Sequence, residues 1–163
     1  MGITRISALE AAKLIRSREI SSLEIVDAIL RHADDLVRTV NAFITVDAEG
    51  ARRAAAAADE LADQDRWLGP LHGVPFSVKD LLDTSGVRTT YGSRAFADNI
   101  PDRDVVAVAR IKSAGGVLLG KTATSELAAS LQTRSTLNGI TRNPWDLDRS
   151  AGGSSGGAGA ATA

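Results

Sequence analysis

The 163-residue chain carries 19 basic and 20 acidic side chains, so its net charge is −1, and no basic excess indicates nucleic acid or an anionic membrane as a partner. Because it has no cysteine, disulfides, thiolate catalysis and cysteine-ligated metals are excluded. A composition of 44% hydrophobic and 24% charged residues is ordinary for one soluble globular domain.

Two helices are predicted near the N-terminus. Ser7 with Glu10, and Ser21 with Glu24, have the spacing of a capping box, in which serine and glutamate satisfy the free backbone donors of a helix start. In the second helix, apolar residues recur at spacings of three and four, which predicts one buried face. The residues of this face are Val26, Ile29, Leu30, Ala33 and Val37.

Further elements follow in chain order. Residues 42–46 are short, β-branched and aromatic, which predicts a strand, and the alanine-rich residues 48–62 predict a helix. A loop over residues 71–79 leads into a short strand at 76–78. Residues 104–114 are expected to be helical.

Gly115-Gly116 end that helix, and residues 117–119 read as a buried strand. Alternating strands and helices predict an α/β fold. From Ala151 the sequence is almost entirely Gly, Ser and Ala, and it stops at Thr162-Ala163 in what looks like the first turns of a helix. We expect a truncated chain, because a helix cut there leaves its last carbonyls uncapped.

The two histidines are isolated, so no metal site is predicted. His32 lies in a predicted helix and should be at the surface or its boundary, and His72, in a Gly/Pro-rich loop, should be structural. The N-terminus has no apolar run long enough for a signal peptide or a membrane span. We therefore expect a cytoplasmic protein.

A P-loop pattern is present but in the wrong context. Gly115, Gly120, Lys121 and Thr122 fit G-x-x-x-x-G-K-T. In a true P-loop a strand precedes the first glycine and the loop stays open around phosphate. Here a helix precedes it and residues 117–119 read as a strand, so nucleotide binding is not predicted.

Two segments carry candidate chemistry. Lys79 ends an apolar strand, so it is either a surface lysine paired with a carboxylate such as Asp80, or a desolvated amine that can act as a general base. The run Gly-Gly-Ser-Ser-Gly-Gly at 152–157 is either a flexible linker or turn, or a loop that another chain or a substrate approaches closely.

Several motifs in the same order resemble the amidase-signature family. They are Gly69–Pro75, Val78–Asp80, Leu119–Thr122, Gly139–Trp145 and the Gly-Gly-Ser-Ser-Gly-Gly run. The resemblance implies an α/β fold with a mixed β-sheet covered by helices on both faces, of which this chain supplies the N-terminal part. Residues 1–163 would then belong to one amidase domain, with 1–68 mainly helical and 69–163 beginning the catalytic α/β core.

The resemblance also implies a Ser–cis-Ser–Lys triad. The catalytic lysine falls on Lys79 and the bridging serine on Ser154, with a cis peptide bond between Gly153 and Ser154. The nucleophilic serine and the oxyanion hole would lie beyond residue 163. A neutral Lys79 would take the nucleophile's proton through the Ser154 hydroxyl, which can donate and accept at once.

Four neighbours are candidates for substrate binding or support of the triad: Ser130, Ser155, Gly152 and Gly153. The two serines are equally compatible with plain loop positions. The implied reaction is hydrolysis of a small-molecule carboxamide to acid and amine or ammonia, with no metal or organic cofactor.

Ala123 and the segment 124–127 depart from the family subunit that amidates mischarged tRNA, which favours a freestanding amidase. The alternatives are the A subunit of a tRNA-dependent amidotransferase, or a non-catalytic fragment that acts as an interaction module. The fragment alone is expected to be inactive. A homo-oligomer remains an open alternative.

Overall fold

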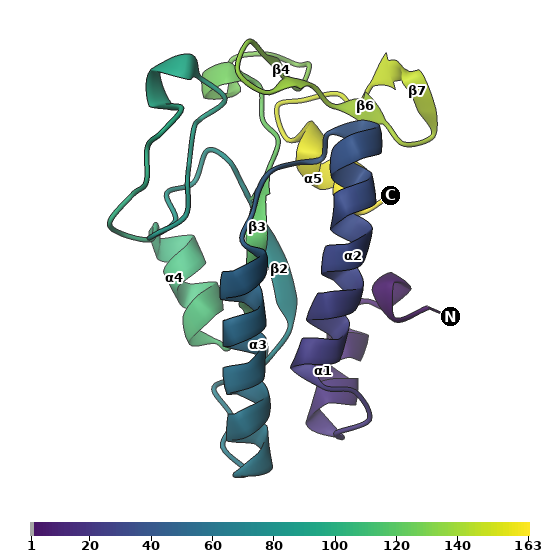
Figure 1. The fold of residues 1–163 in the computed structure, drawn as a ribbon, viewed down its shortest axis with the longest axis vertical. Coiled ribbons are helices and arrows are strands. Elements are labelled where there is room, and N and C mark those ends of the chain that lie inside the picture. Colours follow the sequence, from purple (N-terminus) through teal and green to yellow (C-terminus); the bar gives the residue numbers. More distant parts are fainter. Residues whose placement is uncertain (1) are drawn as a thin grey trace. The chain divides into compact units, whose positions relative to one another are not determined.

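The computed structural model describes residues 2–163 (Figure 1). Their main elements, in chain order, are α1 (Ala8–Arg16), α2 (Ser22–Val40), β1 (Phe43–Val46), α3 (Ala48–Asp63), β2 (Pro75–Lys79), α4 (Val106–Ser113), β3 (Val117–Thr122), β4 (Arg134–Ser135), β5 (Gly139–Ile140), β6 (Arg142–Asn143), β7 (Asp146–Ser150) and α5 (Gly156–Ala161). Short 3-10 helices lie at Ile3–Arg5, Arg94–Phe96 and Glu126–Ala128.

The chain divides into two compact units, each built from three separate segments. The first unit comprises the residues up to 32 together with 47–76 and 109–119. The second unit comprises 33–46, 77–108 and 120–163. All the candidate site residues named above, Lys79 to Ser155, belong to the second unit.

Both predicted helix starts are confirmed. The Ser7 hydroxyl accepts a hydrogen bond from the Glu10 amide at 3.1 Å. Ser21 accepts from the Glu24 amide at 3.0 Å, and its own amide donates to the Glu24 carboxylate at 2.7 Å, which completes the capping box.

The predicted apolar face of α2 is correct except at its end. Val26, Leu30 and Ala33 are buried, whereas Val37 is 37% exposed. In the last turns, Leu36 packs against the cluster formed by Ala33, Val40, Ala42, Phe43 and Ala160. In these last turns the buried face of α2 therefore includes Leu36, and Val37 points away from it.

Packing in the first unit explains the two histidines. His72 is buried; its Nδ1 accepts from the Leu68 amide at 3.1 Å and its Nε2 lies 2.9 Å from the Ala58 carbonyl oxygen. A carbonyl only accepts, so Nε2 carries the proton and the ring is a neutral structural bridge. His32 is exposed. Both predictions for the histidines are confirmed.

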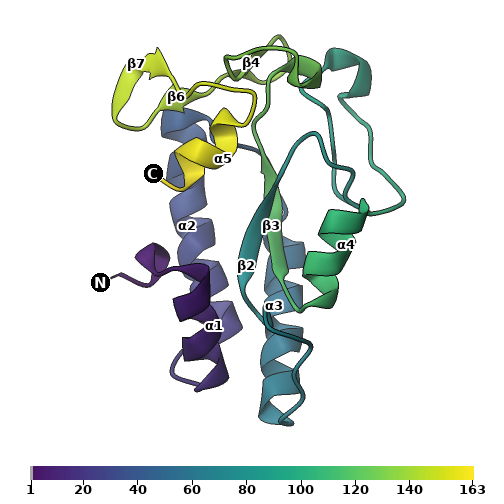
Figure 2. The same cartoon turned by 180° about the vertical axis from the view of Figure 1, so that it is seen from behind.

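A three-stranded sheet has the order β1-β3-β2. β1 is antiparallel to β3, with Phe43 opposite Thr122 and Val46 opposite Gly120. Between β2 and β3, Val117 donates to the Val74 carbonyl and Asp80 to the Thr122 carbonyl, both at 2.9 Å. Residue numbers therefore increase in the same direction along both strands, so β2 and β3 are parallel. The two strands lie side by side in Figure 2. The predicted α/β class with a mixed sheet is confirmed.

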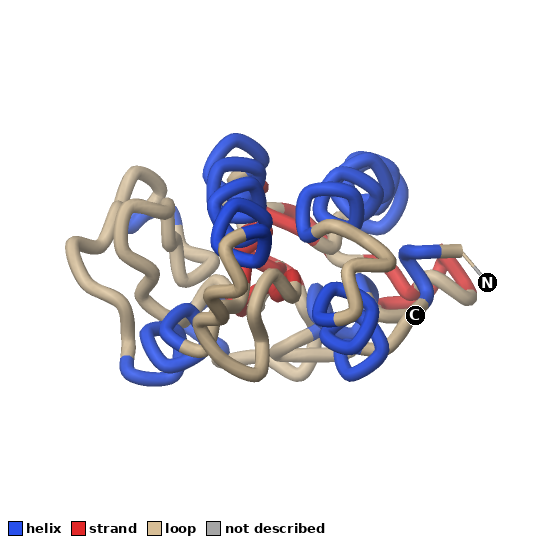
Figure 3. Tube along the Cα trace, turned by 90° about the horizontal axis from the view of Figure 1, so that it is seen from below, coloured by secondary structure: helices blue, strands red, loops and turns tan. Residues whose placement is uncertain are grey.

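The observed strand β3 is longer than predicted and is buried along its whole length, Lys121 included. A long connection from residue 80 to residue 105 separates β2 from α4. It is mostly loop, drawn in tan in Figure 3, with a single 3-10 turn at Arg94–Phe96. Loops of this length are uncommon without a function.

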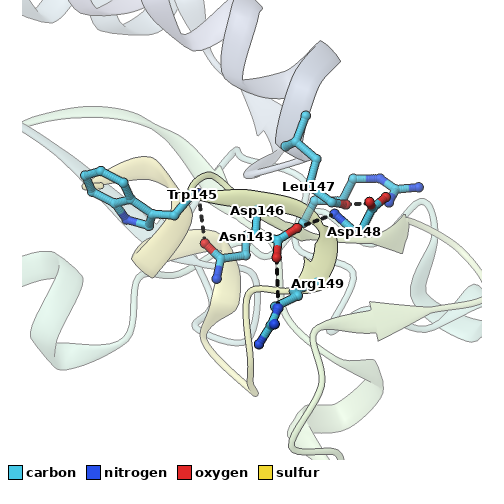
Figure 4. A network of polar contacts seen from close by, with 7 residues as sticks. Asn143, Trp145, Asp146, Leu147, Asp148 and Arg149 are labelled. Carbon is cyan, nitrogen blue, oxygen red and sulfur yellow. Dashed lines mark hydrogen bonds and ion pairs between the residues drawn. The ribbon is translucent and has the colours of Figure 1, made fainter.

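Two small hairpins, β4–β5 and β6–β7, precede the glycine-rich loop. The second hairpin is held by its own polar side chains (Figure 4). Asn143 accepts from the Trp145 amide at 2.9 Å, and Asp146 pairs with Arg149 at 2.8 Å. These contacts position the chain just before residue 152.

The Gly/Ser/Ala-rich tail forms α5, as expected, and Ala160 joins the core of the second unit. None of the helices among residues 2–163 is long and apolar enough to cross a membrane.

Candidate active site

Lys79 and Ser154 are 75 residues apart in sequence, and the structure brings their side chains together. Lys79 is the last residue of β2, and Ser154 lies in the loop between β7 and α5. Lys79 Nζ donates to Ser154 Oγ at 2.7 Å, and both residues are half-buried. The alternative of a surface lysine paired with Asp80 is wrong, since Asp80 is fully buried and hydrogen-bonded to Thr90.

Burial lowers the pKa of this amine. Desolvation penalises the ammonium form, and it holds the pKa of Lys79 below its ordinary value. A neutral amine can accept the Ser154 proton while the Ser154 oxygen accepts another. The pair therefore has the chemistry of a proton relay.

The backbone around Ser154 has the geometry that the resemblance implied. The Gly153–Ser154 peptide bond is cis, and Gly152 has a φ of +77°, in the left-handed region that favours glycine. The Thr133 amide donates to the Gly152 carbonyl at 2.8 Å, and Thr133 Oγ1 accepts from the Gly156 amide at 2.8 Å. Thr133 thus forms hydrogen bonds with the loop both before and after Ser154.

Gly153 is packed directly against backbone, which predicts intolerance to any side chain. A Cβ there would lie 2.8–2.9 Å from backbone atoms of Leu131, Gln132 and Thr133. We expect Gly153→Ala to lower the free energy of unfolding of the full-length protein by about 1–3 kcal/mol, because this overpacking must displace main chain. Chemical denaturation would measure the loss.

Gly159→Ala is the matched control. This glycine lies in α5 and a Cβ there would meet no atom within 4 Å. Alanine should raise stability by up to about 1 kcal/mol through its higher helix propensity. Equal destabilisation by the two variants would contradict the packing argument.

The two other predicted serines have different surroundings. Ser130 is exposed, its hydroxyl accepts from the Gln132 amide at 3.1 Å, and its backbone binds the Ser125 hydroxyl. Ser155 is exposed and begins α5 through its carbonyl, which accepts from the Gly159 amide at 3.2 Å, while its side chain makes no capping bond.

Ser130 lines a cavity of about 480 Å³ in the second unit. The other lining residues are polar: Glu126, Gln132, Arg134, Ser135 and Thr136. The backbone of residues 131–133, which passes this cavity, is the same backbone that contacts Gly153. A role of Ser130 in substrate binding stays a prediction.

The residues of the P-loop pattern have a structural role. Lys121 is fully buried, and its Nζ donates to the Leu82 carbonyl and, at 2.8 Å each, to the hydroxyls of Thr84 and Thr89. An ammonium has three donors, so none of them remains for phosphate.

The sequence reasoning missed that Asp80 and Lys121 are both fully buried. The only signal available was the apolar run 117–119 ahead of Lys121, which continues into the same strand.

Within residues 2–163, no cluster of three or more His, Asp or Glu side chains could hold a metal ion.

Comparisons with known proteins identify the family of the chain. The family model described as Amidase matches residues 24–163. The chain is 44% identical over 161 residues to a glutamyl-tRNA(Gln) amidotransferase of Acidothermus cellulolyticus, namely its A subunit, covering 99% of this chain and 32% of that protein. It is also 44% identical over 158 residues to an acylamidase of Rhodococcus erythropolis, covering 97% and 33%.

A solved structure of fatty acid amide hydrolase matches with a TM-score of 0.91 at 30% identity, over 97% of this chain and 28% of that one. The chain spans about a third of the length of the curated relatives it matches.

Proposed function

Because this chain belongs to the amidase family, we propose that the protein hydrolyses a carboxamide to an acid and an amine or ammonia through a Ser–cis-Ser–Lys triad. The observation that carries this proposal is the 2.7 Å hydrogen bond between Lys79 Nζ and Ser154 Oγ beside the cis peptide bond. Residues 1–163 are the N-terminal part of one amidase domain in this proposal.

The relay works in both directions. A neutral Lys79 takes a proton from Ser154, which takes one from a nucleophilic serine supplied beyond residue 163. The serine oxygen attacks the amide carbon, and an acyl-enzyme forms as the C–N bond breaks. The leaving nitrogen receives the proton back through Ser154. Water then attacks the acyl-enzyme by the same relay and releases the acid.

A freestanding enzyme acting on small amides is our preferred form of the proposal, in the cytoplasm and without a nucleic-acid partner. The acylamidase relative and the fatty acid amide hydrolase structure support it. The departures at Ala123 and residues 124–127 point the same way.

The second candidate is the A subunit of a tRNA-dependent amidotransferase. It is favoured by the relative of that name, which is as similar to this chain as the acylamidase is. In that case the protein works together with a second polypeptide.

The test is amide hydrolysis by the purified full-length protein, followed as release of an aromatic amine from an aryl acylamide. We expect turnover without a partner. The neutral amine is the active form, so kcat/KM should rise with pH through the pKa of Lys79, which burial holds below its ordinary value.

One result would contradict the freestanding form of the proposal: an inactive isolated protein that copurifies with a second, tRNA-binding polypeptide and transfers ammonia only in its presence. A rate that falls as pH rises through this range would contradict the relay itself, since a base that must be neutral cannot give that profile.

A further inference from the structure

The loop that carries Ser154 is held by the end of β3. The Gly157 amide donates to the Ala123 carbonyl at 3.2 Å, and a Cβ at Gly157 would lie 2.2 Å from the Ala123 nitrogen. Ala123 directly follows β3, and the last carbonyl of that strand accepts from the Asp80 amide at 2.9 Å. The end of β3 therefore fixes both the start of α5 and the chain that follows Lys79.

Thr133 holds the same loop through a different set of contacts, in which its amide, its carbonyl and its hydroxyl all take part. The amide donates to the Gly152 carbonyl at 2.8 Å, the carbonyl accepts from the Thr141 amide at 2.9 Å, and Oγ1 accepts from the Gly156 amide at 2.8 Å. Thr133 is 1% exposed, and a Cβ at Gly156 would lie 2.5 Å from its Oγ1. The hydroxyl is thus buried against the first residue of α5.

These contacts fix the loop two residues before Ser154 and two residues after it. The contact at Gly152 uses only main-chain atoms, so any residue with an amide at position 133 can supply it. The contact at Gly156 depends on the hydroxyl of Thr133. A proton relay works only within hydrogen-bond reach, and Lys79 Nζ lies 2.7 Å from Ser154 Oγ. A displacement of the loop by about 1 Å would break that contact.

We propose that the Thr133 hydroxyl is a positioning group of the relay. By binding the Gly156 amide it keeps Ser154 Oγ within reach of Lys79 Nζ, so it acts through Ser154 and is not itself a catalytic residue. This inference rests on the proposed amidase function and adds to it a residue that sets the geometry of the relay.

The first test replaces Thr133 by alanine, valine and serine in the full-length enzyme. Alanine and valine remove the acceptor of the Gly156 amide, so kcat should fall about 10- to 100-fold with little change in KM, because the relay is misplaced while the substrate still binds. Serine keeps the hydroxyl and should restore most of the turnover. Steady-state kinetics on an aryl acylamide would measure both constants. Thr39→Ala, at an exposed position of α2, is the control and should change neither.

A double-variant cycle distinguishes positioning from a general weakening of the fold. If Thr133 acts only through Ser154, the loss of its hydroxyl matters only while the Ser154 hydroxyl is present. T133A combined with S154A should therefore be no less active than S154A alone. An equal loss by T133A with and without Ser154, or a serine variant as impaired as T133A, would overturn the positioning role.

Thermal unfolding shows which variants of Thr133 fold. One hydrogen bond is a small part of the stability of a domain, so the alanine or the valine variant should fold. If neither does, Thr133 serves the fold and the positioning role is wrong. Failure of the amidase proposal looks different, because the wild-type full-length protein then shows no amide hydrolysis, and the positioning role falls with it. An active wild type with an unchanged kcat in T133A refutes the positioning role alone.

Discussion

Replacing Lys79 with alanine in the full-length enzyme is expected to lower kcat/KM for amide hydrolysis by about 1,000- to 10,000-fold. In the proposed relay the amine of Lys79 is the base, and it lies 2.7 Å from Ser154 Oγ. Without it, the nucleophile's proton has no acceptor at the end of the relay. Steady-state kinetics on an aryl acylamide would measure the loss.

The variant Lys79→Arg distinguishes two possible roles of Lys79, that of a neutral base and that of a positive charge. Arginine keeps the charge and a similar reach, but its pKa lies far above that of lysine, so it cannot act as a neutral acceptor. We expect the arginine variant to be as inactive as the alanine variant. If it kept a tenth or more of the activity, Lys79 would be an electrostatic group and the relay would be wrong.

Lys13→Ala is the control for these variants. Lys13 is an exposed lysine on α1, and alanine suits a helix, so both activity and unfolding midpoint should stay at the wild-type level. Thermal unfolding of all three variants would show that a loss at Lys79 is chemical and does not reflect a damaged fold.

Local signals predicted the helices well. A capping box involves residues three apart, so Ser21 and Glu24 reveal the start of α2 without any knowledge of the rest of the fold. The prediction that Val37 is buried was wrong, because the spacing of apolar residues indicates a buried face of the helix but not its exact centre. Leu36 packs against the core instead.

Nonlocal contacts were out of reach of the sequence patterns. The predicted strand covered only residues 117–119 and left out Lys121, a residue type that is rarely fully buried. Its burial depends on Thr84 and Thr89, which lie more than 30 residues earlier in the chain. The hairpin strands β6 and β7 are polar and short, so they give no alternating pattern.

The pairing of Lys79 with Ser154 came from the family resemblance. Neither residue is distinctive alone, since a lysine at a strand end and a serine between glycines are both common. The order of several motifs singled them out, and the fold then places them in contact. Their catalytic roles stay predictions until activity is measured.

Replacing Ser154 with alanine should lower kcat/KM by roughly 100- to 10,000-fold, since in the proposed relay its hydroxyl is the only link between Lys79 and the nucleophile. The alanine variant keeps the backbone of the loop, which Thr133 holds by its contacts with Gly152 and Gly156. The fold should therefore be retained, and the loss should appear in kcat.

The double variant, Lys79→Ala with Ser154→Ala, distinguishes a relay from two separate contributions. Groups that act as one unit are strongly non-additive, so the double variant should be no worse than the poorer single variant. Ser113→Ala, at the exposed end of α4, is the serine control and should keep full activity. If the two losses multiplied, Lys79 and Ser154 would act independently, and the 2.7 Å contact would not carry the proton.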